Sequence, residues 1–126
     1  MLTVLPIQSK DEQKELCSLC GVDFLENAFA YRADDNGFIG ICQFTFENNK
    51  GYIKNLSYAP NVVDNEAMII MLRAAMSFMF RCGLVDSYME KDATTDVLLR
   101  VSGYKENEEG KYYVDLDKFY NTPCCH

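Results

Sequence analysis

The sequence predicts an α/β fold of the α+β type, in which helices cover both faces of a mixed, mostly antiparallel central sheet. The 126 residues suit one domain with one core, so we expect a single domain over residues 1–126. Strand-like and helix-like segments alternate, and three consecutive strand-like segments are joined by tight turns. One of these segments is apolar on both faces, which is typical of a strand inside a covered sheet.

The N-terminal segment is predicted to be a strand followed by a helix. Residues 1–7 have the apolar composition of a strand, and Pro6 is expected to close it. Ser9 and Glu12 have the spacing of a capping box, so a helix should begin after Ser9. Gly21 is expected to end this helix.

Three antiparallel strands are predicted next. Residues 28–33 alternate and lead into an Asp-Asp-Asn-Gly turn, the strongest hairpin signal in the chain. The partner strand spans residues 38–46, and a third strand spans residues 52–58. Simple alternation along the central strand assigns Phe38, Cys42, Phe44 and Phe46 to one face, and Ile39 and Ile41 to the other.

A long apolar helix is predicted after the third strand, with Asp64 as its N-cap and Gly83 as its end. Its polar residues form one narrow stripe, so most of its circumference should be buried. The stripe consists of Glu66, Arg73, Ser77 and Arg81. Its methionines are interpreted as core packing, with a homodimer interface as the alternative.

The C-terminal part is predicted to contain a strand, a short helix and a hairpin. The strand spans residues 85–90. Asp92 is expected to cap the helix, which should end at Gly103. Residues 104–116 are expected to form the hairpin, with its turn at Glu109-Gly110.

Composition excludes several function classes. The net charge of −7 disfavours nucleic-acid and membrane partners, because both require a basic patch. No signal peptide or membrane span is evident, so we expect a cytoplasmic protein with reduced thiols. Cys17 and Cys20 lie on a predicted helix, and Cys124, Cys125 and His126 lie at the terminus, so no metal site is predicted.

Two segments carry a resemblance to a known family. Residues 51–60 (GYIKNLSYAP) resemble the fourth strand of GNAT N-acyltransferases, and residues 98–106 (LLRVSGYKE) resemble a helix end and following strand of that family. The predicted element order is also similar over nearly the whole chain, although the family's second helix is expected to be missing. The resemblance implies a GNAT-like fold whose sheet splays between its fourth and fifth strands. Acetyl-CoA or another acyl-CoA would enter that gap, and an amine on a small molecule or protein would be the acceptor.

The resemblance also places the cofactor-binding residues. The pantetheine arm would pair with the backbone of Leu56, Ser57 and Tyr58, and the diphosphate loop falls on Val63, Asp64, Asn65, Glu66 and Ala67. Where the family has Arg or Gln, this chain has Val63, and where the family has glycines or a small residue, it has Asp64, Glu66 and Met68. The loop is therefore interpreted as degenerate, because carboxylates repel a diphosphate and an Asp64 cap would occupy a helix N–H group.

Catalytic candidates are few. The family's strand-four carboxylate falls on Lys54, and its helix tyrosine falls on Leu99. Tyr58 and Tyr104 lie near the expected reacting centre and are the candidates for proton transfer, with sheet packing as the alternative use of each.

Two function classes therefore remain open. The first is an acyl-CoA-dependent N-acyltransferase whose altered loop disfavours ordinary acetyl-CoA turnover. The second is a non-catalytic, degenerate GNAT module that binds a protein partner or another small ligand. An enzyme should keep the gap open, whereas a module should have it filled by side chains such as Met68 and Tyr58.

Overall fold

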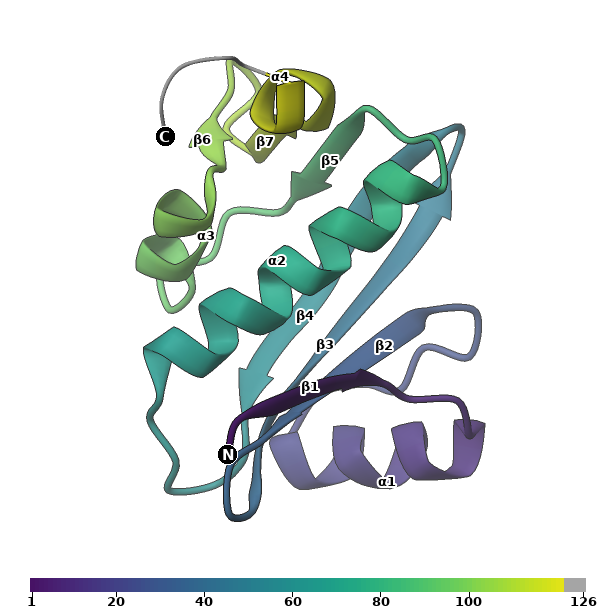
Figure 1. Ribbon diagram of the computed structural model, residues 1–126, viewed down its shortest axis with the longest axis vertical. Helices are drawn as coiled ribbons and strands as arrows, with labels where there is room; N and C mark the ends of the chain where they lie inside the picture. The colour runs from purple at the N-terminus through teal and green to yellow at the C-terminus, as the bar shows by residue number, and fades with distance from the viewer. Residues whose placement is uncertain (122–126) are drawn as a thin grey trace.

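A computed structural model describes residues 1–121 and shows a mixed sheet with helices on both sides (Figure 1). The strands are β1 (Thr3–Pro6), β2 (Phe29–Asp34), β3 (Phe38–Glu47), β4 (Lys50–Tyr58), β5 (Asp86–Met89), β6 (Lys105–Glu106) and β7 (Tyr112–Asp115). The helices are α1 (Lys10–Cys20), α2 (Asn65–Arg81), α3 (Asp96–Ser102) and α4 (Leu116–Asn121). Among residues 1–121, no helix is long and apolar enough to cross a membrane.

The strands form one sheet in the order β1-β2-β3-β4-β5-β7-β6. All neighbouring pairs are antiparallel except β4 and β5, which are parallel. Helix α1 packs over a small core on one face, whereas α2 and α3 pack over the larger core on the other face. Figure 1 shows α2 running diagonally across the strands. The predicted α+β class, with a mostly antiparallel sheet covered on both faces, is confirmed.

The predicted caps of the first two helices are also confirmed. The Ser9 hydroxyl accepts a hydrogen bond from the Glu12 N–H at the start of α1, and Gly21 ends that helix in the left-handed conformation with φ of 72°. Asp64 caps α2 through its side chain, and the helix ends at Cys82 just before Gly83. Local polar residues and glycines therefore set these helix ends as expected.

The predicted faces of β3 are partly wrong because a bulge lies near its start. Ala33 pairs with Gly40 and Asp34 pairs with Phe38, which leaves Ile39 as an extra residue. The extra residue reverses the alternation on its N-terminal side. Ile39 therefore packs in the larger core beneath α2, whereas Phe38 packs on the α1 side, the opposite of the assignment from simple alternation.

The C-terminal elements differ from prediction in two places. Helix α3 begins at Asp96, not directly after Asp92, whose side chain instead accepts the Thr94 N–H in a preceding turn. Helix α4 was not predicted. Its start carries a recognisable signal, since the Asp115 side chain accepts a hydrogen bond from the Lys118 N–H. The predicted hairpin of β6 and β7 is present.

Candidate functional site

Strands β4 and β5 diverge after a short parallel pairing. The pairing begins at Gly51 with Ser87 and ends at Ile53 with Met89, whereas β4 continues to Tyr58. On the side that faces β5, residues 54–58 therefore have no strand partner among the described residues. Backbone N–H and C=O groups on such an edge are available to a ligand that presents amides.

A bulge in β4 lies at the point where the two strands part. Gln43 pairs with Asn55 and Phe44 pairs with Ile53, which leaves Lys54 as the extra residue. A bulge bends its strand and increases the local twist. The end of β4 is thus directed away from β5 by a feature of its own backbone.

The end of β4 lies beside the first turn of α2. The Tyr58 hydroxyl donates a hydrogen bond to the Asn65 side-chain carbonyl oxygen. The Asp64 Oδ1 atom accepts the Ala67 N–H at 3.1 Å, and the Asp64 backbone carbonyl accepts the Met68 N–H at 3.2 Å. This helix start therefore carries a carboxylate of its own, where a bound anion would otherwise benefit from the helix dipole.

Close packing joins β3, β4 and α2 next to this end of the sheet. A Cβ atom on Gly40 would lie 2.6 Å from the Ser57 carbonyl oxygen and 2.8 Å from the Met68 sulfur. Met68 is fully buried, and Leu56 is buried beside it in the same core. The first turn of α2 is thereby held tightly against residues 56–58.

Solved structures of other proteins share this arrangement of strands and helices. Spermidine N-acetyltransferase from Vibrio cholerae has a TM-score of 0.75 at 12% sequence identity, and the match covers 98% of each chain. An acetyltransferase of the GNAT family from Staphylococcus aureus Mu50 has a TM-score of 0.70 at 11% identity, with 92% of this chain and 99% of that chain covered. This chain has the GNAT fold.

A third solved structure, the IAA acetyltransferase from Bacillus cereus ATCC 14579, matches with a TM-score of 0.70 at 14% identity. That match covers 86% of this chain and 79% of the other. No family model matches the sequence, and no curated protein matches it. Structural likeness at these identities establishes the GNAT fold, whereas the activity has to be argued from the site.

The GNAT fold brings most of the predicted cofactor-binding residues to one end of the molecule. Tyr58 and Asn65 are directly bonded, and Asp64 and Ala67 are joined at the helix start. Val63 is 84% exposed, so its apolar side chain faces solvent. These predicted roles stay predictions, but the residues do share one region.

The two candidate tyrosines lie in different surroundings. The Tyr104 side chain is 1% exposed, and its hydroxyl lies 2.6 Å from the Ser87 hydroxyl. The Tyr58 side chain is partly exposed, and its hydroxyl is bonded to Asn65 instead. Burial raises the pKa of both phenols; at Tyr58 a hydrogen bond with the Asp64 backbone opposes the rise, and the Asp64 charge adds to it by less. Both hydroxyls therefore stay protonated near neutral pH.

Lys54 and Leu99, where the resemblance places the family's base and acid, make other contacts in the structure. The Lys54 ammonium lies 3.3 Å from the Glu47 carboxylate and 5.2 Å from the centre of the Tyr52 ring. Leu99 is fully buried in the core. The assignment of the two positions stays a prediction.

A loop joins α1 to β2, in the segment where the resemblance led us to expect no second helix. Residues 22–28 contain no helix, and a buried glutamine holds them on the sheet. The Gln43 side-chain oxygen accepts hydrogen bonds from Gln13 Nε2 at 2.9 Å and from the Leu25 N–H at 3.1 Å. Its Nε2 atom donates to the Asp23 carbonyl at 2.8 Å and to Asn55 Oδ1. Nothing in the sequence pattern singled out Gln43.

The cysteines provide no evidence for a metal centre. Among residues 1–121, no group of three or more His, Cys, Asp or Glu side chains is arranged to hold a metal ion. Burial raises the pKa of Cys17, and it raises the pKa of Cys20 to about 11, so both thiols stay protonated at neutral pH. Cys124, Cys125 and His126 lie outside the described residues.

Proposed function

We propose that this chain is a GNAT-fold N-acyltransferase that binds the thioester arm of acyl-CoA along Leu56, Ser57 and Tyr58. The observation that carries the proposal is the divergence of β4 from β5 after Ile53 and Met89, which leaves the end of β4 without a strand partner. The amides of a pantetheine arm have the hydrogen-bonding groups that such an edge lacks.

The residues at this edge would orient the thioester and protonate the departing sulfur. They would not activate the attacking amine. Bound acyl-CoA would supply the acyl group in a reactive form, and a C–N bond to the amine would form as the C–S bond breaks. The amine nitrogen would release one proton to solvent, and solvent would return one to the Tyr58 oxygen. Tyr58 would hold a proton at its hydroxyl for the departing sulfur, and its raised pKa keeps that proton in place at neutral pH. Tyr104 would serve only if the core around it opened, because its side chain is 1% exposed.

The diphosphate end of CoA fits this chain poorly. The Asp64 carboxylate is bonded to the Ala67 N–H, and Glu66 stands exposed in the same turn. Each carboxylate raises the energy of a nearby phosphate. We therefore infer that recognition rests on the acyl and pantetheine groups, with a weak contribution from the nucleotide.

The acceptor is inferred to be an amine on a small molecule or a protein. The net charge of −7 attracts cations and disfavours nucleic acids and anionic membranes as partners. A polyamine is one candidate, since the structurally similar Vibrio cholerae enzyme is a spermidine N-acetyltransferase. A homodimer and a cytoplasmic location complete the proposal, and residues 1–126 would act as one domain.

A non-catalytic GNAT module is the second candidate, and specific contacts favour it. Asp64 occupies the helix start, Tyr58 is bonded to Asn65 across the loop, and Met68 is fully buried beside Ser57. In this case the same end of the sheet would bind a protein partner or another small ligand in place of acyl-CoA.

Calorimetric titration with acetyl-CoA and with acetyl-pantetheine, which lacks the diphosphate, separates the two candidates. The test variant is Asp64→Ser/Glu66→Gln, in which serine preserves the helix cap while both charges are removed. The matched control is Asp11→Ser/Glu15→Gln, which removes two exposed charges from α1.

The N-acyltransferase proposal predicts that the wild type binds acetyl-pantetheine. It also predicts that the test variant, but not the control, binds acetyl-CoA about tenfold more tightly, as expected for roughly 1.4 kcal/mol of relieved repulsion. Failure of the wild type and of both variants to bind either compound would overturn the proposal and favour the non-catalytic module.

A further inference from the structure

A pocket lies at the β1–β2 edge of the sheet, away from the β4–β5 gap. Its volume is about 310 Å³, at the small end of the range of about 300–1,000 Å³ in which small-molecule sites fall. Phe78, which lines it, is thirteen residues along α2 from Asn65, or about 20 Å of helix. The pocket is therefore separate from the proposed acyl-CoA site.

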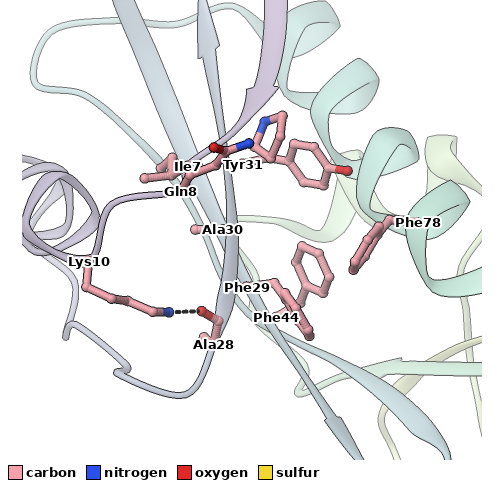
Figure 2. Close-up of a pocket in the computed structure, with 10 residues that line it drawn as sticks. Ile7, Gln8, Lys10, Ala28, Phe29, Ala30, Tyr31, Phe44 and Phe78 are labelled. Atoms are coloured by element: carbon pink, nitrogen blue, oxygen red, sulfur yellow. Dashed lines mark hydrogen bonds between the residues drawn. The ribbon is translucent and has the colours of Figure 1, made fainter. Parts of the chain in front are cut away.

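Aromatic rings form one wall of this pocket. Figure 2 shows Phe29, Tyr31, Phe44 and Phe78 directed to the α2 side of β2. The rings contact one another, with the centre of Phe29 5.2 Å from that of Phe78 and 5.6 Å from that of Phe44. Phe29 is 43% exposed, so an apolar surface is open to a ligand at this edge.

The edge is open because β1 ends early. β1 pairs with β2 as far as Pro6 with Tyr31, and the Ile7 N–H then adds a last hydrogen bond, 2.8 Å long, to the Ala30 carbonyl. The chain next turns through Gln8 into α1. Ala28 and Phe29 therefore lie beyond the end of this pairing, where the pocket begins.

A lysine without an ion-pair partner lies on the other side of this edge. The Lys10 ammonium donates to the Ala28 carbonyl at 2.7 Å and to the Gln13 side-chain oxygen at 3.2 Å (Figure 2). Both acceptors are neutral, and an ammonium has a third N–H to donate. Within residues 1–121, no carboxylate forms an ion pair with Lys10.

The surrounding charges also favour an anion near Lys10. Lys10 is the first residue of α1, and the start of a helix carries a positive potential. The first turn also contains Asp11 and Glu12, but neither lines the pocket, and Glu12 lies 3.4 Å from the guanidinium of Arg32. An anionic group at the pocket rim would thus meet a positive charge that no protein carboxylate neutralises.

We propose that this pocket binds a small amphipathic carboxylate, with its apolar body on the aromatic wall and its carboxylate on Lys10. A charge-assisted hydrogen bond to the ammonium would fix the orientation, and burial against the rings would supply most of the binding energy. This site does not depend on acyl-CoA binding, and it stands whether the chain is an enzyme or a non-catalytic module.

Three matched probes test the proposal: 4-phenylbutyrate, 4-phenylbutanol and 4-phenylbutylamine. They share one apolar body and differ in the charge of the end group. Titrations are followed by NMR, with the methyl signals of Ala28 and Ala30 reporting the pocket. The test variants are Lys10→Met and Gln8→Glu, and the control is Lys14→Met, an exposed lysine on the same helix that does not line the pocket.

The expected result is saturable binding of 4-phenylbutyrate with shifts at Ala28 and Ala30, and weaker binding of the other two probes. Lys10→Met should weaken binding of the carboxylate about tenfold, the size of one charge-assisted hydrogen bond, and Gln8→Glu should weaken it as well. Lys14→Met should leave it unchanged. A melting curve for each variant checks that it is folded.

The proposal is overturned by any of three results with folded protein. These are the absence of saturable 4-phenylbutyrate binding, equal binding of all three probes, and equal effects of Lys10→Met and Lys14→Met. Shifts confined to residues 56–68 would likewise overturn it, because the probe would then occupy the β4–β5 gap.

Discussion

Gln43 shows how one buried side chain can hold a loop on a sheet. Its amide uses both lone pairs and both N–H groups, on Gln13, Leu25, Asp23 and Asn55. The side chain is completely buried, so each of these bonds replaces one that water would otherwise make. The loop of residues 22–28 is thereby held in place without a helix.

We predict that Gln43→Leu lowers the free energy of unfolding by about 2–4 kcal/mol. The reason is that several buried backbone and side-chain groups, including the Leu25 N–H and the Asp23 carbonyl, would lose their partner. Urea unfolding measures the change. Gln8→Leu, at an exposed position, should change the same quantity by less than about 0.5 kcal/mol, and equal effects of the two substitutions would contradict the argument.

The sequence revealed some residues of the candidate site but not their partners. Asp64 was predicted as a cap from its position alone, because N-capping depends on neighbours within the same turn. The bond from Tyr58 to Asn65 and the burial of Tyr104 depend on how distant segments pack, which local pattern does not encode. Gln43 was missed because a polar residue on a strand is ordinarily expected to face solvent.

At the scale of elements, contact between helix and sheet depends on two glycines. A Cβ on Gly40 would lie 2.6 Å from a backbone oxygen, that of Ser57. A Cβ on Gly51 would lie 2.5 Å from the sulfur of Met79, a flexible side chain. The two positions are equally crowded, but only at Gly51 is the crowding atom able to move by rotation about side-chain bonds.

We predict that Gly40→Ala destabilises the protein more than Gly51→Ala does. Overpacking costs about 1–3 kcal/mol, and Gly40→Ala should lie at the upper end because the β4 backbone must shift. Thermal or urea unfolding of the two variants gives the comparison. Equal costs, or a greater cost for Gly51→Ala, would show that Met79 is as rigidly held as the backbone.

Most elements could be predicted, and the exceptions have physical causes. Caps and turn glycines fixed the ends of α1, α2 and the β2–β3 hairpin to within a residue or two. The faces of Phe38 and Ile39 were exchanged because the bulge between β2 and β3 arises from pairing, not from either strand alone. Helix α4 has only six residues, too few to show a helical period.

At the scale of the molecule, the sheet consists of two unequal parts joined by a narrow connection. Strands β1 to β4 form a continuous antiparallel unit, whereas β5 joins β4 through three residue pairs. The short strand β7 pairs with β5, and β6 pairs with β7. Packing of α3 and α4 against α2 supplies further contacts between the two parts, including the stacked rings of Phe80 and Tyr120.

We predict that the C-terminal part opens more readily than the N-terminal part. Amide hydrogen exchange should be faster in β5 and β7 than in β2 and β3, because fewer pairings must break to expose them. Mass spectrometry of peptic fragments after timed exchange measures this. Equal protection in both groups of strands would mean that the sheet unfolds as a single cooperative unit.

The cap at the start of α2 has a consequence for competition between anions. Because Asp64 is covalently attached to the helix that it caps, its carboxylate is a tethered ligand with a high effective concentration at the Ala67 N–H. A dissolved phosphate has to compete with that intramolecular anion and not merely with water. The Asp64 carboxylate therefore competes with any external anion for the start of α2, and substitution of Asp64 would change how strongly it competes.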